Sequence, residues 1–183
     1  MKSTGKLKHE HQAVLKALEI LEKIGRAMEA GQPYNLDHVR QIMTFLTVFV
    51  DQCHHGKEEK VLFPALEKAG VPPKGGPVGV MLMEHDQGRG YIRGMQSAVD
   101  ALAGGHPEEA ASFVTNAGAY AALLRQHIAK EDNVLYPMAD RLFSPGLDNT
   151  IAEEFQRIEE DEIGAGRHEE FDQMLHHLEH VYL

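Results

Sequence analysis

Apolar residues recur along the chain at the three- and four-residue spacing of an α-helix, which predicts an all-α protein. The first such stretch runs from about Lys6 to Glu29, with Ser3 or Thr4 as the expected cap, and Gly31-Gln32-Pro33 ends it. Its apolar stripe consists of Leu7, Val14, Leu18, Leu21 and Met28.

Three more helices of this kind follow, at about 35–68, 80–102 and 107–142. Residues 71–79 are rich in proline and glycine and divide the first pair of helices from the second. The short connections predict an antiparallel up-down-up-down four-helix bundle. Pro64 and Pro137 stand near the ends of the second and fourth helices, where we expect a kink.

The pattern divides the chain into two parts. We expect residues 1–143 to form the bundle and residues 144–183 to form a C-terminal helical extension packed on it. The extension should hold two short helices, at about 148–163 and 167–182, separated by Gly164-Ala165-Gly166.

Composition narrows the class of protein. The chain has 183 residues, 43% of them hydrophobic, which suits one globular unit without a membrane span or a secretory leader. A net charge of −10 disfavours nucleic acid as a partner. The single cysteine, Cys53, excludes an internal disulfide and fits a reducing compartment, so we expect a cytoplasmic protein. The 12 histidines are the unusual feature.

One segment occurs twice. His54 to Pro64 and His127 to Pro137 both follow the pattern His-x-x-x-Glu-(acid)-x-Val-Leu-(aromatic)-Pro. Residues i and i+4 share one face of a helix, so each copy directs an imidazole and a carboxylate, from Glu58 or Glu131, toward a common point. The spacing from the first to the second copy is 73 residues for both the histidine and the glutamate.

His11 and His85 form a second pair, 74 residues apart. At 1.5 Å per residue, all four histidines lie about 27 to 30 Å from the same end of the bundle. Four imidazoles and two carboxylates are too many for one tetrahedral zinc site and suit two metal ions, with iron favoured and manganese or zinc as alternatives. The ferritin-like alternative is excluded because the sequence contains no Glu-x-x-His.

Over residues 5 to 142 the chain resembles the hemerythrin-like HHE cation-binding family. The resemblance rests on His11, His54-x-x-x-Glu58, His85 and His127-x-x-x-Glu131, with Leu62-Phe63-Pro64 and Leu135-Tyr136-Pro137. It implies a four-helix bundle around two oxo- or hydroxo-bridged iron ions, with both glutamates bridging and the four histidines as terminal ligands. It also implies a protein that binds dioxygen or nitric oxide, or that handles iron under stress.

The third helix departs from the oxygen-carrying members. These have a His-x-x-x-His that ends at the position of His85, whereas here Met81 stands four residues before it and Arg89 four after it. The ligand set is more similar to that of the iron-centre repair proteins. Water, a diatomic ligand or a carboxylate of the extension then completes the centre, and Glu159 is our candidate carboxylate.

Helical spacing suggests roles for the neighbouring side chains. Tyr120 lies seven residues before His127 on the same face, so it either packs or approaches a bound oxygen species. His9 and His55 should point about 100° away from the site and are not expected to be ligands. The acids next to the ligands should be solvated or pair with lysines; they are Glu10, Glu59, Glu84 and Asp132.

Three functions fit these residues. The first is a non-haem di-iron protein that binds or senses O2 or NO, or that handles iron. The second is a di-iron enzyme that reduces peroxide or NO, which also needs an open coordination position. The third is a bundle in which the ions only hold the helices together. The oligomeric state is not predicted.

Overall fold

The computed structural model describes residues 1–164 and 166–183, and this part of the chain is helical without strands, which confirms the all-α prediction. Ala165, part of the predicted break between the last two helices, lies outside the described residues. The elements in chain order are α1 (Lys2–Glu29), α2 (Leu36–Thr44), η1 (Phe45–His55), η2 (Glu58–Leu62), α3 (Phe63–Lys68), α4 (Pro77–Ala103), η3 (Pro107–Glu109), α5 (Ala110–Lys130), η4 (Glu131–Leu135), α6 (Tyr136–Leu142), α7 (Pro145–Glu162) and α8 (Arg167–Tyr182).

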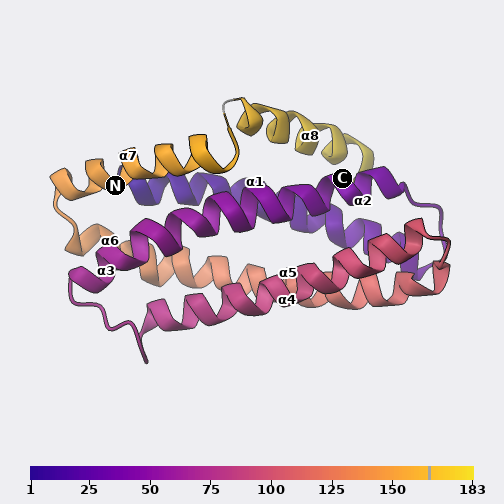
Figure 1. The fold of residues 1–183 in the computed structure, drawn as a ribbon, viewed down its shortest axis with the longest axis horizontal. Helices are drawn as coiled ribbons and strands as arrows, with labels where there is room; N and C mark the ends of the chain where they lie inside the picture. Colours follow the sequence, from indigo (N-terminus) through magenta and orange to yellow (C-terminus); the bar gives the residue numbers. More distant parts are fainter. Residues whose placement is uncertain (165) are drawn as a thin grey trace.

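Four long helical segments lie along the long axis of the molecule (Figure 1). They are α1, then α2 through α3, then α4, and finally α5 through α6. The turns that follow α1 and α4 lie at one end, and the loop between α3 and α4 lies at the other (Figure 1). Gly31 (φ 63°) and Gly105 (φ 90°) provide the left-handed backbone at the two turns, where glycine avoids a steric penalty.

The starts of the helices are set by capping groups. Asn35 caps α2 through its side-chain oxygen. In contrast, α1 begins at Lys2, so Ser3 and Thr4 lie inside the helix rather than before it. Asp148 of α7 acts as the cap instead, because its carboxylate accepts hydrogen bonds from the backbone N–H groups of Lys2 (2.9 Å) and Ser3 (3.2 Å). A distant residue thus satisfies the free donors at the start of α1.

The second and fourth segments contain π-helical stretches. The segments η1, η2 and η4 have this wider turn, and η2 and η4 begin at Glu58 and Glu131. Pro64 and Pro137 follow directly, each in the first turn of a new α-helix, where the missing N–H costs no hydrogen bond. The structure therefore places a π-helical turn just before each proline, and the kinks stay predictions.

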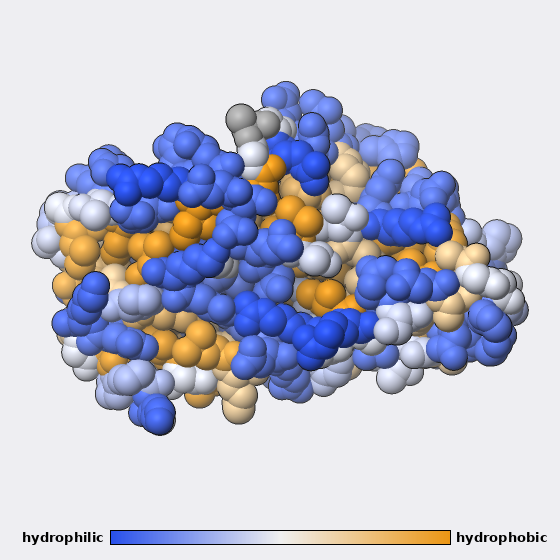
Figure 2. Space-filling model, viewed as in Figure 1, coloured by the Kyte–Doolittle hydropathy of each residue, from blue (hydrophilic) through white to orange (hydrophobic). Residues whose placement is uncertain are grey.

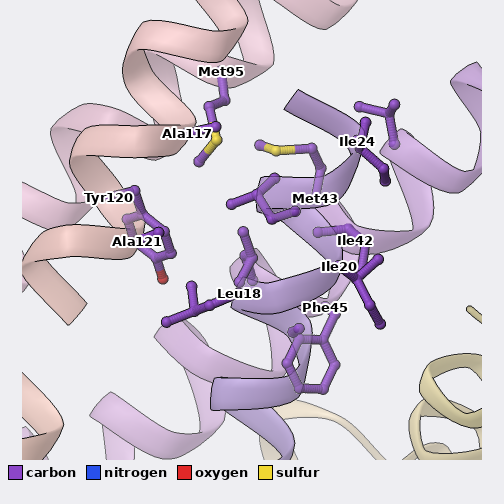
Figure 3. Packing of buried hydrophobic residues seen from close by; sticks show 14 of the residues in the cluster. Leu18, Ile20, Ile24, Ile42, Met43, Phe45, Met95, Ala117, Tyr120 and Ala121 are labelled. Carbon is purple, nitrogen blue, oxygen red and sulfur yellow. The ribbon is translucent and has the colours of Figure 1, made fainter. Parts of the chain in front are cut away.

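The apolar core forms two clusters. The larger one packs side chains such as Leu18, Phe45 and Met95 (Figure 3). The smaller one contains Leu7, Phe63 and further residues near the loop between α3 and α4. On each of the four segments, buried polar residues separate the positions that enter the two clusters. A polar layer thus lies inside an otherwise apolar interior.

The C-terminal helices α7 and α8 lie along α1 and the second segment (Figure 1). From α7, Ile151 and Phe155 enter the smaller cluster, and from α8, Phe171 and Leu175 enter the larger one. Burying such side chains contributes about 1.5 to 3 kcal/mol each. The extension therefore packs on both sides of the polar layer.

The face of the molecule shown in Figure 2 is mainly hydrophilic, with smaller apolar patches between polar stripes. Throughout residues 1–164 and 166–183, no helix combines the length and the apolar character needed to cross a membrane.

Candidate metal centre

The six residues singled out by the repeat meet in the polar layer. Each of the four long segments contributes at least one of them, and all are at most 2% exposed. They are His11 from α1, His54 and Glu58 from the second segment, His85 from α4, and His127 and Glu131 from the fourth segment. The structure therefore brings together the six predicted side chains.

The imidazoles form two pairs across neighbouring helices. Nε2 of His11 lies 3.1 Å from Nε2 of His54, and we call these residues the first pair. Nε2 of His85 lies 3.0 Å from Nε2 of His127, and these residues are the second pair. In each pair the same ring nitrogens face each other at the centre of the bundle.

Both carboxylates span the two pairs. Glu131 places Oε2 3.3 Å from Nε2 of His11 and Oε1 3.1 Å from Nε2 of His127. Glu58 places Oε2 3.4 Å from Nε2 of His85 and 3.9 Å from Nε2 of His54. This is the arrangement expected of two bridging carboxylates.

The four acids next to the predicted ligands contact the imidazoles on the side that faces away from the centre. Each binds Nδ1 of a histidine on the next segment, so the contacts run in a closed ring around the bundle. The contacts are Glu10 to His54 (2.8 Å), Glu59 to His85 (2.7 Å), Glu84 to His127 (2.9 Å) and Asp132 to His11 (3.0 Å). The expected pairing with lysines is confirmed for Glu10 and Glu84, but the sequence did not predict that the neighbouring helix brings an imidazole to each of the four acids.

Cations hold three of these acids in turn. Lys57 Nζ lies 2.5 Å from Glu10, Arg89 lies 2.7 Å from Glu59, and Lys130 pairs with Glu84. Burial opposes ionisation of Glu10, but the hydrogen bonds and charges of His54 and Lys57 outweigh it and lower the pKa of Glu10 to about 2. Glu10 thus stays ionised and accepts a hydrogen bond from the Nδ1–H group of His54.

This donor set fits metal cations. When Nδ1–H donates to a carboxylate, Nε2 presents a lone pair, so four lone pairs converge with the oxygens of Glu58 and Glu131. Within the described chain, Oε2 of Glu58 and both oxygens of Glu131 are buried without a well-aligned hydrogen bond. Unpaired buried carboxylate oxygens are costly, and a bound cation removes that cost.

Protons compete for the same atoms. Burial alone would lower the pKa of His11 and His85, but the hydrogen bonds and charges of nearby carboxylates raise each to about 9. The nearest acids are Asp132 and Glu131 for His11, and Glu58 and Glu59 for His85. Metal binding must therefore displace protons from this cluster at neutral pH.

His55 also reaches the centre, although the sequence placed it outside. It is 4% exposed, its ring stacks on that of His85 at 3.9 Å, and Nδ1 lies 3.3 Å from Asp51. Burial and the neighbouring imidazoles, above all that of His85, hold the pKa of His55 well below its usual value. The prediction assumed 100° per residue, whereas His54 and His55 end the π-helical segment η1, whose wider turn brings adjacent side chains closer in direction.

Tyr136 is a second residue that the sequence did not single out. Its hydroxyl donates to Oε1 of Glu58 at 2.7 Å and lies 3.3 Å from Nε2 of His11. The available signal was its place in the repeat, where the matching residue of the first copy is Phe63.

Two other candidates lie outside the cluster of six. Glu159 contacts Lys6 (2.6 Å) and Lys57 (3.0 Å), and Lys57 separates it from Glu10. Tyr120 projects from α5 into the larger apolar cluster (Figure 3). Its buried hydroxyl finds no hydrogen-bond partner among the described residues, and burial raises its pKa. These positions support packing for Tyr120 and an ion-pair role for Glu159.

Comparison with known proteins identifies a family of cation-binding domains. The hemerythrin HHE cation-binding domain family matches residues 3–139. Uncharacterized proteins of Mycobacterium tuberculosis (strain ATCC 25618 / H37Rv) and Mycobacterium bovis are 24% identical over 158 residues, which is 86% of this chain and 61% of theirs. The iron-sulfur cluster repair protein YtfE of Musicola paradisiaca is 30% identical over 102 residues, 52% of this chain and 45% of its own. The chain thus spans less than two thirds of the length of these relatives. Because the family match covers most of the sequence, the chain belongs to the hemerythrin HHE cation-binding domain family.

Proposed function

We propose that the protein holds two iron ions between the two histidine pairs, inside an antiparallel up-down-up-down bundle, and that it binds or senses O2 or NO or handles iron under stress. One observation carries the proposal: two pairs of facing Nε2 atoms are joined by two buried carboxylates, Glu58 and Glu131. Each ion would then receive two imidazole nitrogens and one oxygen from each carboxylate.

The donor types favour iron, manganese or zinc over magnesium and calcium, and the similarity to an iron-sulfur cluster repair protein favours iron among these three. Mixed nitrogen and oxygen donors suit iron, manganese and zinc, whereas an oxygen-only set would favour magnesium or calcium. Four protein donors per ion also leave coordination positions free in an octahedral arrangement. Iron in such a site supplies reversible electron transfer and binding of diatomic molecules.

The protein's own side chains prepare this site for a small ligand. The ring of four carboxylates fixes each imidazole with Nε2 directed inward. The two apolar clusters flank the polar layer and limit the entry of water. The hydroxyl of Tyr136 is the one neutral O–H group that the described contacts place against both Glu58 and His11, where it can donate a hydrogen bond.

The similarity to an iron-sulfur cluster repair protein supports iron handling as a form of this function. The buried Tyr136 hydroxyl supports the enzymatic alternative, reduction of peroxide or NO, because such a reaction needs a proton donor close to the metal. Peroxide therefore belongs with O2 and NO among the small molecules to be tested.

Anaerobic reconstitution with Fe(II) tests the proposal. We expect two irons per chain by metal analysis, and optical spectra that change on addition of O2, NO or peroxide. A reversible O2 adduct supports carriage or sensing, turnover supports an enzyme, and slow oxidation with loss of iron supports iron handling. Retention of one iron or none would contradict the two-ion site, and two irons that respond to none of the three molecules would leave only a structural role.

A matched control distinguishes the loss of a ligand from the loss of a surface histidine. His11→Ala removes a proposed ligand, whereas His9→Ala changes an exposed histidine two residues away on the same helix. Iron content should fall in the first variant and stay unchanged in the second.

A further inference from the structure

We propose that His55 is a fifth imidazole ligand of the centre and binds the ion held by the second pair, His85 and His127. The inference rests on the proposed two-ion site and adds to it a ligand from a helix on which the sequence predicted only one histidine ligand.

His55 lies close to three of the proposed ligand residues. One potential ligand atom each from His55, Glu58, His85 and His127 lie within 4.8 Å of one another, and all four residues are buried. The ring of His55 is nearly parallel to that of His85, at an interplanar angle of 18°, and meets the ring of His127 edge-on at 5.8 Å. His55 therefore faces the second pair rather than the solvent.

A carboxylate lies behind the ring of His55, as it does behind the other four imidazoles. Each of the four histidines in the pairs directs Nδ1 to a carboxylate and Nε2 to the centre. His55 has the same kind of outer contact, because its Nδ1 lies 3.3 Å from Oδ1 of Asp51. Arg89 binds both Asp51 (2.8 Å) and Glu59 (2.7 Å), so one guanidinium holds the carboxylates behind His55 and His85. Such outer contacts are typical of histidines that bind metals.

The other repeat has no imidazole at the matching position. The residue 73 positions after His55 is Ile128, which is 5% exposed and belongs to the larger apolar cluster. An apolar side chain thus fills the matching position in the second copy. An imidazole at position 55 adds to the second pair a nitrogen that can bind a metal ion, which the side chain of Ile128 cannot do.

A fifth imidazole makes the two ions unequal. The ion at the second pair would have three imidazoles, and the ion at the first pair, His11 and His54, would have two. The first ion therefore keeps the additional open position, on the side where Tyr136 lies 3.3 Å from Nε2 of His11. A small exogenous ligand should bind there, one molecule per chain.

Replacing His55 tests the assignment. His55→Phe keeps an aromatic ring for stacking on His85 but has no ligand nitrogen, and Ile128→Val is the matched change in the other repeat. The Fe(II)-loaded chains would be compared by metal affinity, by 57Fe Mössbauer spectra and by NO bound per chain. We expect the wild type and Ile128→Val to show two distinct iron environments and one NO per chain. In His55→Phe, one of the two irons should bind at least about 10-fold more weakly, and a second NO should bind where both irons are retained.

The outcomes separate the two proposals. If the wild type fails to hold two irons, the two-ion site itself is wrong, and the assignment of His55 falls with it. If the wild type holds two irons and His55→Phe keeps their affinities, spectra and NO stoichiometry, only the assignment is overturned. His55→Ala with added imidazole provides the second measurement: recovery of the wild-type spectrum supports ligation, and no recovery in a folded, two-iron variant contradicts it.

Discussion

The two repeats, residues 11–64 and 85–137, share the same pattern of histidines and glutamates but differ in the residues around it. Each provides a histidine preceded by a glutamate, a His-x-x-x-Glu turn and a π-helical turn that begins at the second glutamate. Each also provides two of the four acids that contact the imidazoles. In the first repeat, however, Lys57 is fully buried, whereas the matching Lys130 has a side chain that is 40% exposed. Phe63 in the first repeat corresponds to Tyr136 in the second. The shared pattern creates two equivalent positions, and the differences make them unequal.

The C-terminal extension causes part of this inequality. Helix α7 covers the first repeat, where Glu159 contacts Lys57, so His54, Glu10, Lys57 and Glu159 form one chain of contacts. The matching chain from His127 through Glu84 ends at the partly exposed Lys130. The protein therefore shields Lys57, behind the first pair, from water more completely than Lys130, behind the second.

The largest expected effect is the loss of iron when either of the two glutamates that the repeats share is replaced. Glu131→Ala and Glu58→Ala each remove a carboxylate that spans both histidine pairs, so each should abolish binding of two ions rather than of one. Iron per chain, measured after desalting, should fall below one in both variants. The exposed Glu67 provides the control, and Glu67→Gln should keep the wild-type content. Loss of a single ion in either variant would mean that its carboxylate serves one pair only.

The second effect is a pH dependence that the two repeats should share. In the metal-free protein the pKa of His11, in the first pair, and of His85, in the second, is raised from 6.5 to about 9. The stability that these protons contribute is complete below pH 6.5 and is lost as the pH rises through 9, at about 3 kcal/mol for each group.

Metal binding should show the opposite trend, because the ions need unprotonated imidazoles. Urea unfolding of the metal-free protein between pH 6 and 9.5 checks the first trend. Calorimetric titration in buffers of different ionisation enthalpy checks the second, through the protons released per ion. A metal-free stability that stays constant across this range would contradict the raised pKa values.

The third effect separates the repeats. Lys57→Met leaves Glu10 buried without its cation and should destabilise the protein by about 3 kcal/mol. Lys130→Met removes a partly exposed ion pair and should cost less than about 1 kcal/mol. Chemical unfolding of both metal-free variants measures the difference. Equal losses would show that α7 does not distinguish the two lysines.

The sequence predicted the six side chains of the site better than the residues that contact them. The repeat predicted that six side chains meet, and the structure brings them together; that they hold iron stays a prediction. The ring of carboxylates was missed because each contact joins two helices, and helical spacing describes only one. His55 was missed because rotation by 100° per residue holds for an α-helix and not for the π-helical η1. Asp148 was missed as the cap of α1 because it is distant in sequence.

The smallest expected effect concerns the single hydroxyl that distinguishes the aromatic residues of the repeats. Tyr136→Phe removes the donor to Oε1 of Glu58 and should cost about 1 to 2 kcal/mol of stability in the metal-free protein. In the iron-loaded protein it should weaken binding of a small ligand at the first pair, since that ligand loses a hydrogen-bond donor, while the iron content stays at two.

The exchange of Phe63 for tyrosine provides the complementary test. Phe63 is buried and its ring lies 5.8 Å from that of His85, so Phe63→Tyr adds a hydroxyl beside the second pair. If the hydroxyl acts only where a coordination position is open, Phe63→Tyr will leave NO affinity unchanged although Tyr136→Phe lowers it. Equal changes in NO affinity for the two variants would show that both ions accept the ligand, and the inequality of the two repeats would then lie in their stability alone.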